Sequence, residues 1–398
     1  MKKILIMSHA MEIGGAETAL LGLLENIDTK KYEVDLFLMR HSGELMQYIP
    51  STVHLLPEIP QYASLAIPIS TVVKNGHIRI AVGRVFGKYK ARRRVKKLGF
   101  LADNAVSLEY SHKYTKNAMP KISDKKYDLA ISFLTPHYFV AEKVSSKKKI
   151  AWIHTDYSVV KVDIESELKM WAKYDHIVSI SENVSESFLK IFPSLRARIV
   201  LIENILPIHY IRKLENAFLA EREMPLDGSV KFLSIGRFSD AKKFDEIPAI
   251  CKGIRDKGIN VKWYLIGYGG EEKLIRQKIL ETHMEEFVLI LGKRENPYPY
   301  IKMCDIYLQL SRYEGKSVAV REAQSLNKPV IITNYKTAQS QLKDGYDGII
   351  VPMDIQGSVE GIIEVIRDKE LQQKLVENTL KNDYTNASEI EKLYELIF

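Results

Sequence analysis

The chain is poor in cysteine and has no long apolar segment. Cys251 and Cys304 are its only cysteines, which is too few for a disulfide framework, and no Cys-x2-Cys spacing indicates a metal site. No apolar run reaches 18 residues, so we expect no membrane-spanning helix. The segment from Met1 to Ser8 begins with charge like a signal peptide, but no small-residue cleavage site follows, so it predicts a strand. We therefore expect a cytoplasmic protein.

Acidic residues are absent from one segment, Ile59 to Ala102, which contains ten of the basic residues. Apolar residues interleave with these charges, which is typical of an amphipathic helix on an anionic bilayer, where each basic side chain adds about 1 kcal/mol. We assign this membrane contact to Arg84, Lys88, Arg92, Arg93, Arg94, Lys96 and Lys97. A solvated helix face or loop is one alternative. Nucleic acid is another, although the segment shows no recognition module and its densest basic run has Tyr89 as its only aromatic residue.

A chain of 398 residues exceeds the length at which a single core keeps growing, so we expect two domains. Hydrophobic residues make up 46% and charged residues 27%, as in soluble globular proteins. We place a first domain at 1–205, a second domain at 206–385 and a C-terminal helix at 386–398. Both domains are predicted to be α/β, with parallel sheets whose strand ends face a central cleft.

Short apolar runs predict the strands of the two sheets. In the first domain we expect strands at Lys3–Ser8, Tyr32–Leu38, Val53–Leu56, Leu129–Phe133, Lys149–Ile153, His176–Ile180 and Val200–Ile202. In the second domain we expect them at Val230–Ile235, Trp263–Ile266, Val288–Leu291, Asp305–Leu310 and Pro329–Thr333.

Two glutamates of the second domain are the most informative feature of the sequence. Glu314 and Glu322 are eight positions apart, which on one helix is two turns and about 80° more, so they would not share a face. We therefore place Glu314 in a loop, where Gly315 gives the backbone room to turn. Ser317 is predicted to cap a helix over about Val318–Leu326, which contains Glu322.

The start of such a helix binds phosphate through its free backbone N–H groups and its dipole. We therefore assign Lys316, Ser317 and Val318 to binding of a phosphorylated donor. Glu314 would lie at the reacting end of the donor, and Glu322, farther along the helix, could reach a ribose.

Two further loops follow predicted strands of the second domain. Gly236, Arg237 and Lys242 follow the first of these strands, and the two cations can clamp a diphosphate, although most such side chains are merely solvated. Gly267 and Tyr268 open a glycine-rich turn that lacks the full spacing of a dinucleotide fingerprint. We interpret this turn as the loop beside the nucleotide base, with Lys293 or Arg294 flanking it.

In the first domain, two positions lie where ligands of open parallel sheets bind. Gly15 belongs to a glycine pair before a helix, which either lets a ligand approach the backbone or forms a simple turn. His154 follows a predicted strand and is either a ligand contact or a packed histidine. No second ligand stands three or four residues from it, so a zinc site is not indicated.

Together these segments resemble the retaining glycosyltransferases of family four, the glycosyl transferases of group 1, which have the GT-B fold. The resemblance rests on the Glu-x7-Glu segment with its flanks Asn296–Tyr300 and Asp344–Gly348, on Gly14–Glu17, and on Arg237 with Lys242. It looks closest to bacterial enzymes that build capsules and other surface polysaccharides. One departure is Lys243, which stands where family members usually have glycine.

The resemblance implies transfer of a sugar, with retention of configuration, from a nucleoside diphosphate sugar (we expect a UDP-sugar) to a lipid-linked or saccharide acceptor. It implies that His154, Glu314, Arg237 and Lys242 are the catalytic residues, with His154 against the transferred sugar, and that neither a cofactor nor a metal is needed. The enzyme would associate peripherally with the inner face of the cell membrane. A sugar-nucleotide epimerase and a non-catalytic accessory subunit of a glycosyltransferase complex are the alternatives.

Overall fold

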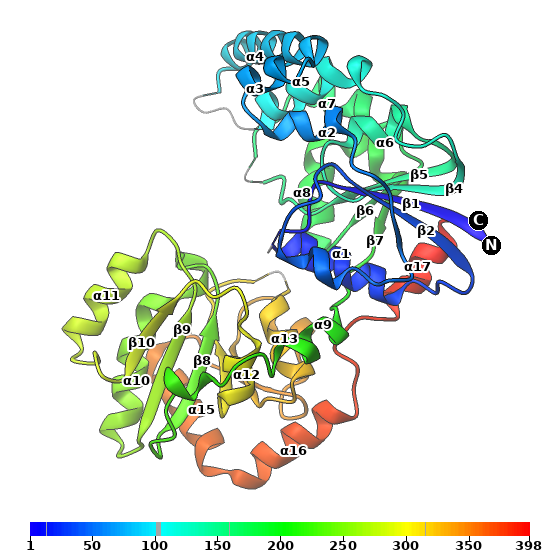
Figure 1. The fold of residues 1–398 in the computed structure, drawn as a ribbon. Helices are drawn as coiled ribbons and strands as arrows, with labels where there is room; N and C mark the ends of the chain where they lie inside the picture. The colour runs from blue at the N-terminus through cyan, green and yellow to red at the C-terminus, as the bar shows by residue number, and fades with distance from the viewer. Residues whose placement is uncertain (13, 101–104, 159, 315) are drawn as a thin grey trace. The chain divides into compact units, whose positions relative to one another are not determined.

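The structure is a computed structural model that describes residues 1–12, 14–100, 105–158, 160–314 and 316–398. The chain forms two compact units. Unit 1 consists of Met1–Pro207 together with Asn386–Phe398, and unit 2 consists of Ile208–Thr385. Each unit is built around one sheet with helices packed against it (Figure 1).

The described residues of unit 1 form a seven-stranded sheet in the order β3-β2-β1-β4-β5-β6-β7, with all neighbours parallel. Its strands are β1 (Lys2–Ser8), β2 (Tyr32–Leu38), β3 (His54–Leu55), β4 (Lys126–Ser132), β5 (Ser145–Ile153), β6 (His176–Ser179) and β7 (Ile199–Leu201). The apolar runs predict each of these strands. The largest difference between predicted and observed bounds is at β5, which begins at Ser145 rather than Lys149. Its first residues are polar and more exposed than the buried residues at its carboxyl end.

The helices of unit 1 complete the layer around this sheet. They are α1 (Gly15–Asn26), α2 (Pro60–Ala63), α3 (Ile69–Lys74), α4 (Ile78–Leu98), α5 (Ala105–Thr115), α6 (His137–Lys143), α7 (Ile164–Trp171), α8 (Glu182–Ile191) and α17 (Glu389–Glu395). Helix α17 comes from the end of the chain. It joins unit 1 because Tyr394 stacks on Tyr32, with ring centroids 4.6 Å apart, and accepts a hydrogen bond from the Asp28 amide at 2.8 Å.

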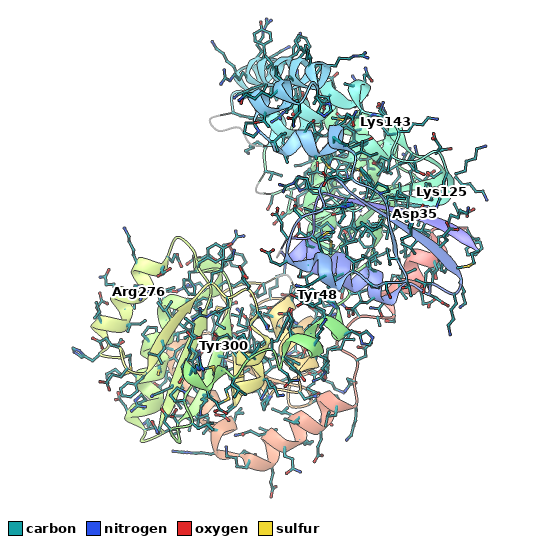
Figure 2. The ribbon with its side chains drawn as sticks, in the orientation of Figure 1. Asp35, Tyr48, Lys125, Lys143, Arg276 and Tyr300 are labelled. Atoms are coloured by element: carbon teal, nitrogen blue, oxygen red, sulfur yellow. The ribbon has the colours of Figure 1, made fainter. Side chains whose placement is uncertain are left out.

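A buried carboxylate ties the edge of this sheet together. Asp35 on β2 is 1% exposed and pairs with Lys125 at 3.0 Å; both side chains are labelled in Figure 2. Tyr127 donates to the same carboxylate at 2.7 Å, and the Nδ1 atom of His54 lies 2.8 Å from it. Burial raises the pKa of Asp35, but these hydrogen bonds and the lysine charge outweigh burial, so that its pKa falls below the ordinary value.

Unit 2 repeats the parallel arrangement, with the strand order β10-β9-β8-β11-β12-β13 among its described residues. Its strands are β8 (Val230–Ile235), β9 (Val261–Ile266), β10 (Val288–Gly292), β11 (Ile306–Gln309), β12 (Val330–Thr333) and β13 (Ile349–Val351). Its helices are α9 (Ile208–Leu214), α10 (Ile247–Asp256), α11 (Glu272–Glu281), α12 (Tyr298–Met303), α13 (Val318–Ser325), α14 (Ala338–Gln341), α15 (Ile355–Arg367) and α16 (Lys369–Leu380).

The core of unit 2 lies between its sheet and the pair α10 and α15. Phe232, Trp263 and Leu308 point from the strands into this core, where Ile250 and Ile362 from the two helices meet them. All five side chains are fully buried. Fully burying one large apolar side chain contributes about 1.5–3 kcal/mol, so this layer fixes the sheet on which the loops of the candidate site stand.

Candidate active site

The loops predicted to bind the donor start from one edge of the sheet of unit 2. Because the strands are parallel and in register, with Ile235 beside Ile266 and Gln309 beside Ile332, the segments that follow β8, β9, β11 and β12 all leave at the same edge. In open α/β sheets this carboxyl edge is where ligands bind.

The loop after β8 is bonded to the loop after β11. The Arg312 amide donates to the Ala241 carbonyl oxygen at 2.9 Å. The Arg312 guanidinium forms a fork on Asp245, with distances of 2.9 and 2.8 Å, and also reaches Glu246 at 2.9 Å. No local pattern selects Arg312, since its acidic partners lie more than sixty positions away along the chain.

Lys242 and Glu314, predicted from separate segments, form an ion pair. Glu314 also accepts a hydrogen bond from the Ser311 hydroxyl at 2.8 Å. Ser311 in turn accepts from the side-chain Nε2 of Gln309 at 3.0 Å, and the side-chain Oε1 of Gln309 accepts from the Tyr307 hydroxyl at 2.9 Å. This buried chain of hydrogen bonds fixes the orientation of Glu314 from inside the sheet.

Lys243, the departure from the family pattern, occupies a backbone conformation that favours glycine. Its φ of 57° and ψ of 30° lie in the left-handed region. The side chain is 2% exposed; it bonds the Met353 carbonyl oxygen and lies 3.1 Å from Glu246. Lysine therefore keeps the turn that glycine would make, and the turn still directs Lys242 toward Glu314.

Arg237 and Tyr268 occupy neighbouring loops and are both exposed. The Phe238 amide donates to the Tyr268 carbonyl oxygen at 2.9 Å, which holds the two loops together. A Cβ atom at Gly267 would lie 1.9 Å from the Gly236 carbonyl oxygen, so no larger residue fits there without moving the loop. The two loops therefore present one cation and one aromatic ring to solvent at the carboxyl edge.

Arg294 does not have the freedom that we expected of a residue beside the base. Its guanidinium pairs with Glu223 and lies over the Tyr300 ring, 5.7 Å from the centroid; Tyr300 is labelled in Figure 2. Lys293 is the better placed of the two basic residues, because its Nζ atom lies 5.5 Å from the centroid of the Tyr268 ring. An arginine guanidinium pairs well with a carboxylate, and Glu223 already occupies that of Arg294.

The helix after Glu314 forms as predicted, as α13 over Val318–Ser325, but Ser317 does not cap it with its side chain. Instead, the Gln341 side chain binds the Ser317 backbone on both sides, accepting from its amide at 2.6 Å and donating to its carbonyl oxygen at 3.3 Å. Ser317 is buried, Lys316 is half-buried and Val318 is 42% exposed. Gly315 lies outside the described residues.

Glu322 lies inside unit 2 and accepts a hydrogen bond from the Tyr298 hydroxyl at 2.9 Å. Burial raises its pKa to about 7, against an ordinary value of 4.5. Tyr298 belongs to the segment Asn296–Tyr300, which the resemblance already singled out, so the structure brings that segment into contact with Glu322. A carboxyl group poised near neutral pH at the edge of a site is a functional candidate.

In unit 1, His154 follows β5 directly and packs against Phe133, with ring centroids 4.6 Å apart. Burial lowers its pKa to about 4, so the imidazole is neutral at pH 7. Its Nε2 atom is buried without a hydrogen-bond partner among the described residues. Gly15 is the first residue of α1, and a Cβ atom placed on it would meet nothing within 4 Å. Packing therefore does not require glycine there.

The basic segment of unit 1 is largely the helix α4, which packs beside α5 (Figure 1). The two helices approach closely because Gly83 and Gly87 face α5; a Cβ atom on either would lie 2.7 Å from a backbone carbonyl oxygen. Lys88, Arg92, Arg93, Lys96 and Lys97 are exposed.

Two of the basic residues that we predicted to contact a membrane turn toward the protein instead. Arg84 donates to the carbonyl oxygens of Ser64 at 2.9 Å and Ile67 at 2.6 Å. Arg94 forms a fork on Asp163, with two distances of 2.8 Å. Their charges are used inside unit 1, because unpaired carbonyl groups and a buried carboxylate need donors.

A search of the described residues finds neither a group of three metal-ligating side chains nor a helix long and apolar enough to cross a membrane.

The sequence of unit 2 matches a known protein family. Residues 220–382, most of unit 2, match the family described as glycosyl transferases group 1. Unit 2 is a glycosyl transferases group 1 domain. The resemblance to the glycosyl transferases of group 1 is thereby confirmed over these residues. The group 1 domain contains Arg237, Lys242, Glu314 and Glu322, all of which lie within the matched residues.

Two curated relatives show how far the sequence similarity of this chain extends. The chain is 27% identical over 183 residues to the N-acetyl-alpha-D-glucosaminyl L-malate synthase of Bacillus anthracis, covering 45% of this chain and 48% of that protein. It is 24% identical over 228 residues to an N-acetylgalactosamine-N,N'-diacetylbacillosaminyl-diphospho-undecaprenol 4-alpha-N-acetylgalactosaminyltransferase of Campylobacter jejuni, covering 56% and 58%. The alignments thus span about half the length of these relatives.

The similarity of structure extends over the whole chain. The Anabaena protein HepE, solved in complex with UDP and glucose, matches with a TM-score of 0.63 over 99% of each chain, at 16% sequence identity. At this identity the match establishes the fold alone. The predicted GT-B fold with two parallel-sheet α/β domains is confirmed.

Proposed function

We propose that this protein transfers a sugar from a UDP-sugar to a lipid-linked or saccharide acceptor, with retention of the anomeric configuration and without a metal ion. The observation that carries the proposal is the meeting of Lys242 and Glu314 at the carboxyl edge of the group 1 domain. The fold shared with a UDP-bound protein and the undecaprenol-linked substrate in the name of one relative support the choice of donor and acceptor classes.

In the proposed reaction the bond between the anomeric carbon and the diphosphate breaks, and the bond to an acceptor hydroxyl oxygen forms on the same face. The hydroxyl proton passes to the leaving phosphate. Negative charge grows on the diphosphate, and Arg237, Lys242 and the start of α13 stabilise it electrostatically. Removing one such donor typically costs about 100- to 1000-fold in turnover.

The remaining residues have binding roles in this proposal. Glu314, held in place by Ser311, accepts hydrogen bonds from hydroxyl groups of the sugar, and Glu322 accepts one from the ribose. Tyr268 offers its exposed ring to the base. Because its pKa is about 4, His154 is a neutral imidazole at pH 7. It can form hydrogen bonds with the transferred sugar, but it is not an imidazolium that could act as a general acid.

The proposal is tested by incubating the protein with a panel of UDP-, GDP- and ADP-sugars and a saccharide or undecaprenyl-diphosphate-sugar acceptor. We expect one UDP-sugar to give UDP and an α-linked product by NMR, with the same rate in the presence of a chelator. The Arg237→Ala variant should lose most turnover while its thermal unfolding stays unchanged. An epimerised nucleotide without transfer would make the protein an epimerase, and no turnover with any donor would favour an accessory subunit.

We also propose that the protein binds an anionic membrane through the exposed face of α4, which we call the α4 face. It combines the exposed apolar residues Ile78, Val82, Val85, Phe86 and Tyr89 with the exposed basic residues Arg79, Lys88, Arg92, Arg93, Lys96 and Lys97. Between Ile59 and Ala102 no acidic residue opposes them. Six cations at about 1 kcal/mol each, together with partly inserted apolar side chains, suffice for reversible binding.

Sedimentation with vesicles tests this second proposal. The protein should pellet with phosphatidylglycerol vesicles and remain free with phosphatidylcholine vesicles or with duplex DNA at moderate salt. Arg92→Glu with Arg93→Glu should abolish pelleting, whereas Lys374→Glu, an exposed position on α16 in unit 2, should not. Equal binding of the double variant to the anionic vesicles would contradict the role of the α4 face.

A further inference from the structure

Unit 1 contains a cavity of about 200 Å³, and the proposed chemistry uses only His154 of its wall. It lies between α5, α6, α7 and the carboxyl end of β5. Trp152, Tyr157 and Trp171 form much of its aromatic wall, and Glu109 and Glu167 contribute carboxyl groups. His154 belongs to the same wall, so the cavity adjoins the residue that the proposed function places against the transferred sugar.

Three polar atoms of this wall are buried without a hydrogen-bond partner among the described residues: Glu109 Oε2, Trp152 Nε1 and His154 Nε2. The other oxygen of Glu109 is fully engaged, accepting from Tyr138 and, at 2.7 Å, from Ser166. Glu109 and Trp152 are 8% and 3% exposed. An unpaired buried polar atom costs about 1–3 kcal/mol, so a ligand that forms hydrogen bonds with all three atoms would be stabilised in this cavity.

The cavity does not suit a strongly charged ligand. Burial lowers the pKa of His137 and His112 to about 3 each, so both imidazoles are neutral at pH 7. Burial also raises the pKa of Glu109, and it raises that of Glu167 to about 7. No lysine or arginine is among the described residues of the wall, which leaves a phosphate without a counter-charge. A neutral ligand therefore fits best.

The size and bonding pattern narrow the choice further. A dry cavity of about 150 Å³ accommodates a benzene ring, so a cavity of about 200 Å³ accommodates a substituted six-membered ring. Trp152 offers a donor and Glu109 an acceptor, and an alcohol hydroxyl can serve both because it donates and accepts. Aromatic side chains pack against the C–H groups of a saturated ring, and the hydroxyl groups of that ring can bond the three polar atoms. A flat apolar ligand would leave these three atoms unpaired.

From these observations we infer that the cavity binds one neutral pyranose ring, with hydroxyl groups bonded to Trp152, Glu109 and His154. The inference deepens the proposed function and rests on it in one respect: the ring is taken to be the terminal sugar of the acceptor. The donor sugar is also a pyranose and would offer the same hydroxyl groups. Experiment can separate binding of the acceptor sugar from binding of the donor sugar.

Saturation-transfer NMR with the whole protein tests the inference. The probes are the methyl glycosides of glucose, galactose, N-acetylglucosamine and N-acetylgalactosamine, each titrated without any nucleotide. Trp152→Phe keeps the ring and removes the donor, and Glu109→Gln replaces an acceptor by a donor. Each should weaken the best glycoside about tenfold, since one hydrogen bond to a buried group is worth about 1.4 kcal/mol. Glu165→Gln, which is exposed on the adjoining α7, should leave binding unchanged.

The outcomes are distinct. If a glycoside binds the wild type and both variants weaken it while circular dichroism stays native, the inference holds for an acceptor sugar. If the variants affect only a UDP-sugar titrated in parallel, the ring in the cavity belongs to the donor. If no sugar binds, or if both variants bind as the wild type does, the inference is wrong. Turnover of UDP-sugars is measured on the same preparations, so loss of the proposed function would be seen separately.

Discussion

The buried carboxyl group of Glu322 predicts a specific dependence of stability on pH. Its pKa rises from 4.5 in the unfolded chain to about 7 in the folded protein because burial disfavours the charged form. A raised pKa means that the folded state holds the proton more tightly. The stabilisation is therefore fully present below about pH 4.5 and is lost as the pH rises through about 7. At about 1.4 kcal/mol per pH unit, the loss amounts to about 3 kcal/mol.

Glu322→Gln removes this titration and keeps an acceptor for the Tyr298 hydroxyl. At pH 8 the variant should be about 3 kcal/mol more stable than the wild type, and at pH 4.5 the two should be alike. For a unit the size of Ile208–Thr385, 3 kcal/mol corresponds to about 6–12 °C in the unfolding temperature. Calorimetry at both pH values measures the difference.

The control is Glu364→Gln, an exposed position on α15, which should change the unfolding temperature little at either pH. If Glu322→Gln shifted stability equally at pH 4.5 and pH 8, the carboxyl group would not be neutral inside the fold, and the reasoning would fail. At pH 8 the ionised Glu322 lowers the free energy of unfolding by about 3 kcal/mol. Stability therefore does not explain a glutamate at this position, and a binding role does.

Three further changes have definite expected results. Gly267→Ala should lower the unfolding temperature and weaken UDP binding, because its Cβ would lie 1.9 Å from a carbonyl oxygen; calorimetry and titration check this. Ser311→Ala should lower kcat/KM about tenfold, since it loosens the Glu314 carboxylate that binds the sugar hydroxyls, and steady-state kinetics measure it. Lys125→Met should cost about 2 kcal/mol in urea unfolding, because it strips one charged partner from the buried Asp35.

The sequence predicted the sheets well because their strands are continuous apolar runs. Parallel strands buried on both faces need such runs, so β2 at Tyr32–Leu38 and β8 at Val230–Ile235 have the predicted ends. The start of β5 was missed because its first residues are a polar edge without that pattern.

Side-chain partners were harder to predict than the loops that contain them. Lys242 and Glu314 were each selected for a ligand, but their mutual contact depends on the register of two strands that are distant in sequence. Arg94 looks like its neighbours in a basic run, and only the fold brings Asp163 to it. The cavity beside His154 likewise brings together α5, α6, α7 and the carboxyl end of β5, which no local spacing in the sequence connects.

The central claim is that Lys242 stabilises the departing diphosphate, and one measurement tests it most directly. Turnover of the UDP-sugar that the panel identifies is compared for the wild type, Lys242→Met and the control Lys257→Met, an exposed lysine after α10. The account predicts a loss of about 100- to 1000-fold in kcat for Lys242→Met and none for the control. A Lys242→Met variant that turns over within about threefold of the wild type would contradict it.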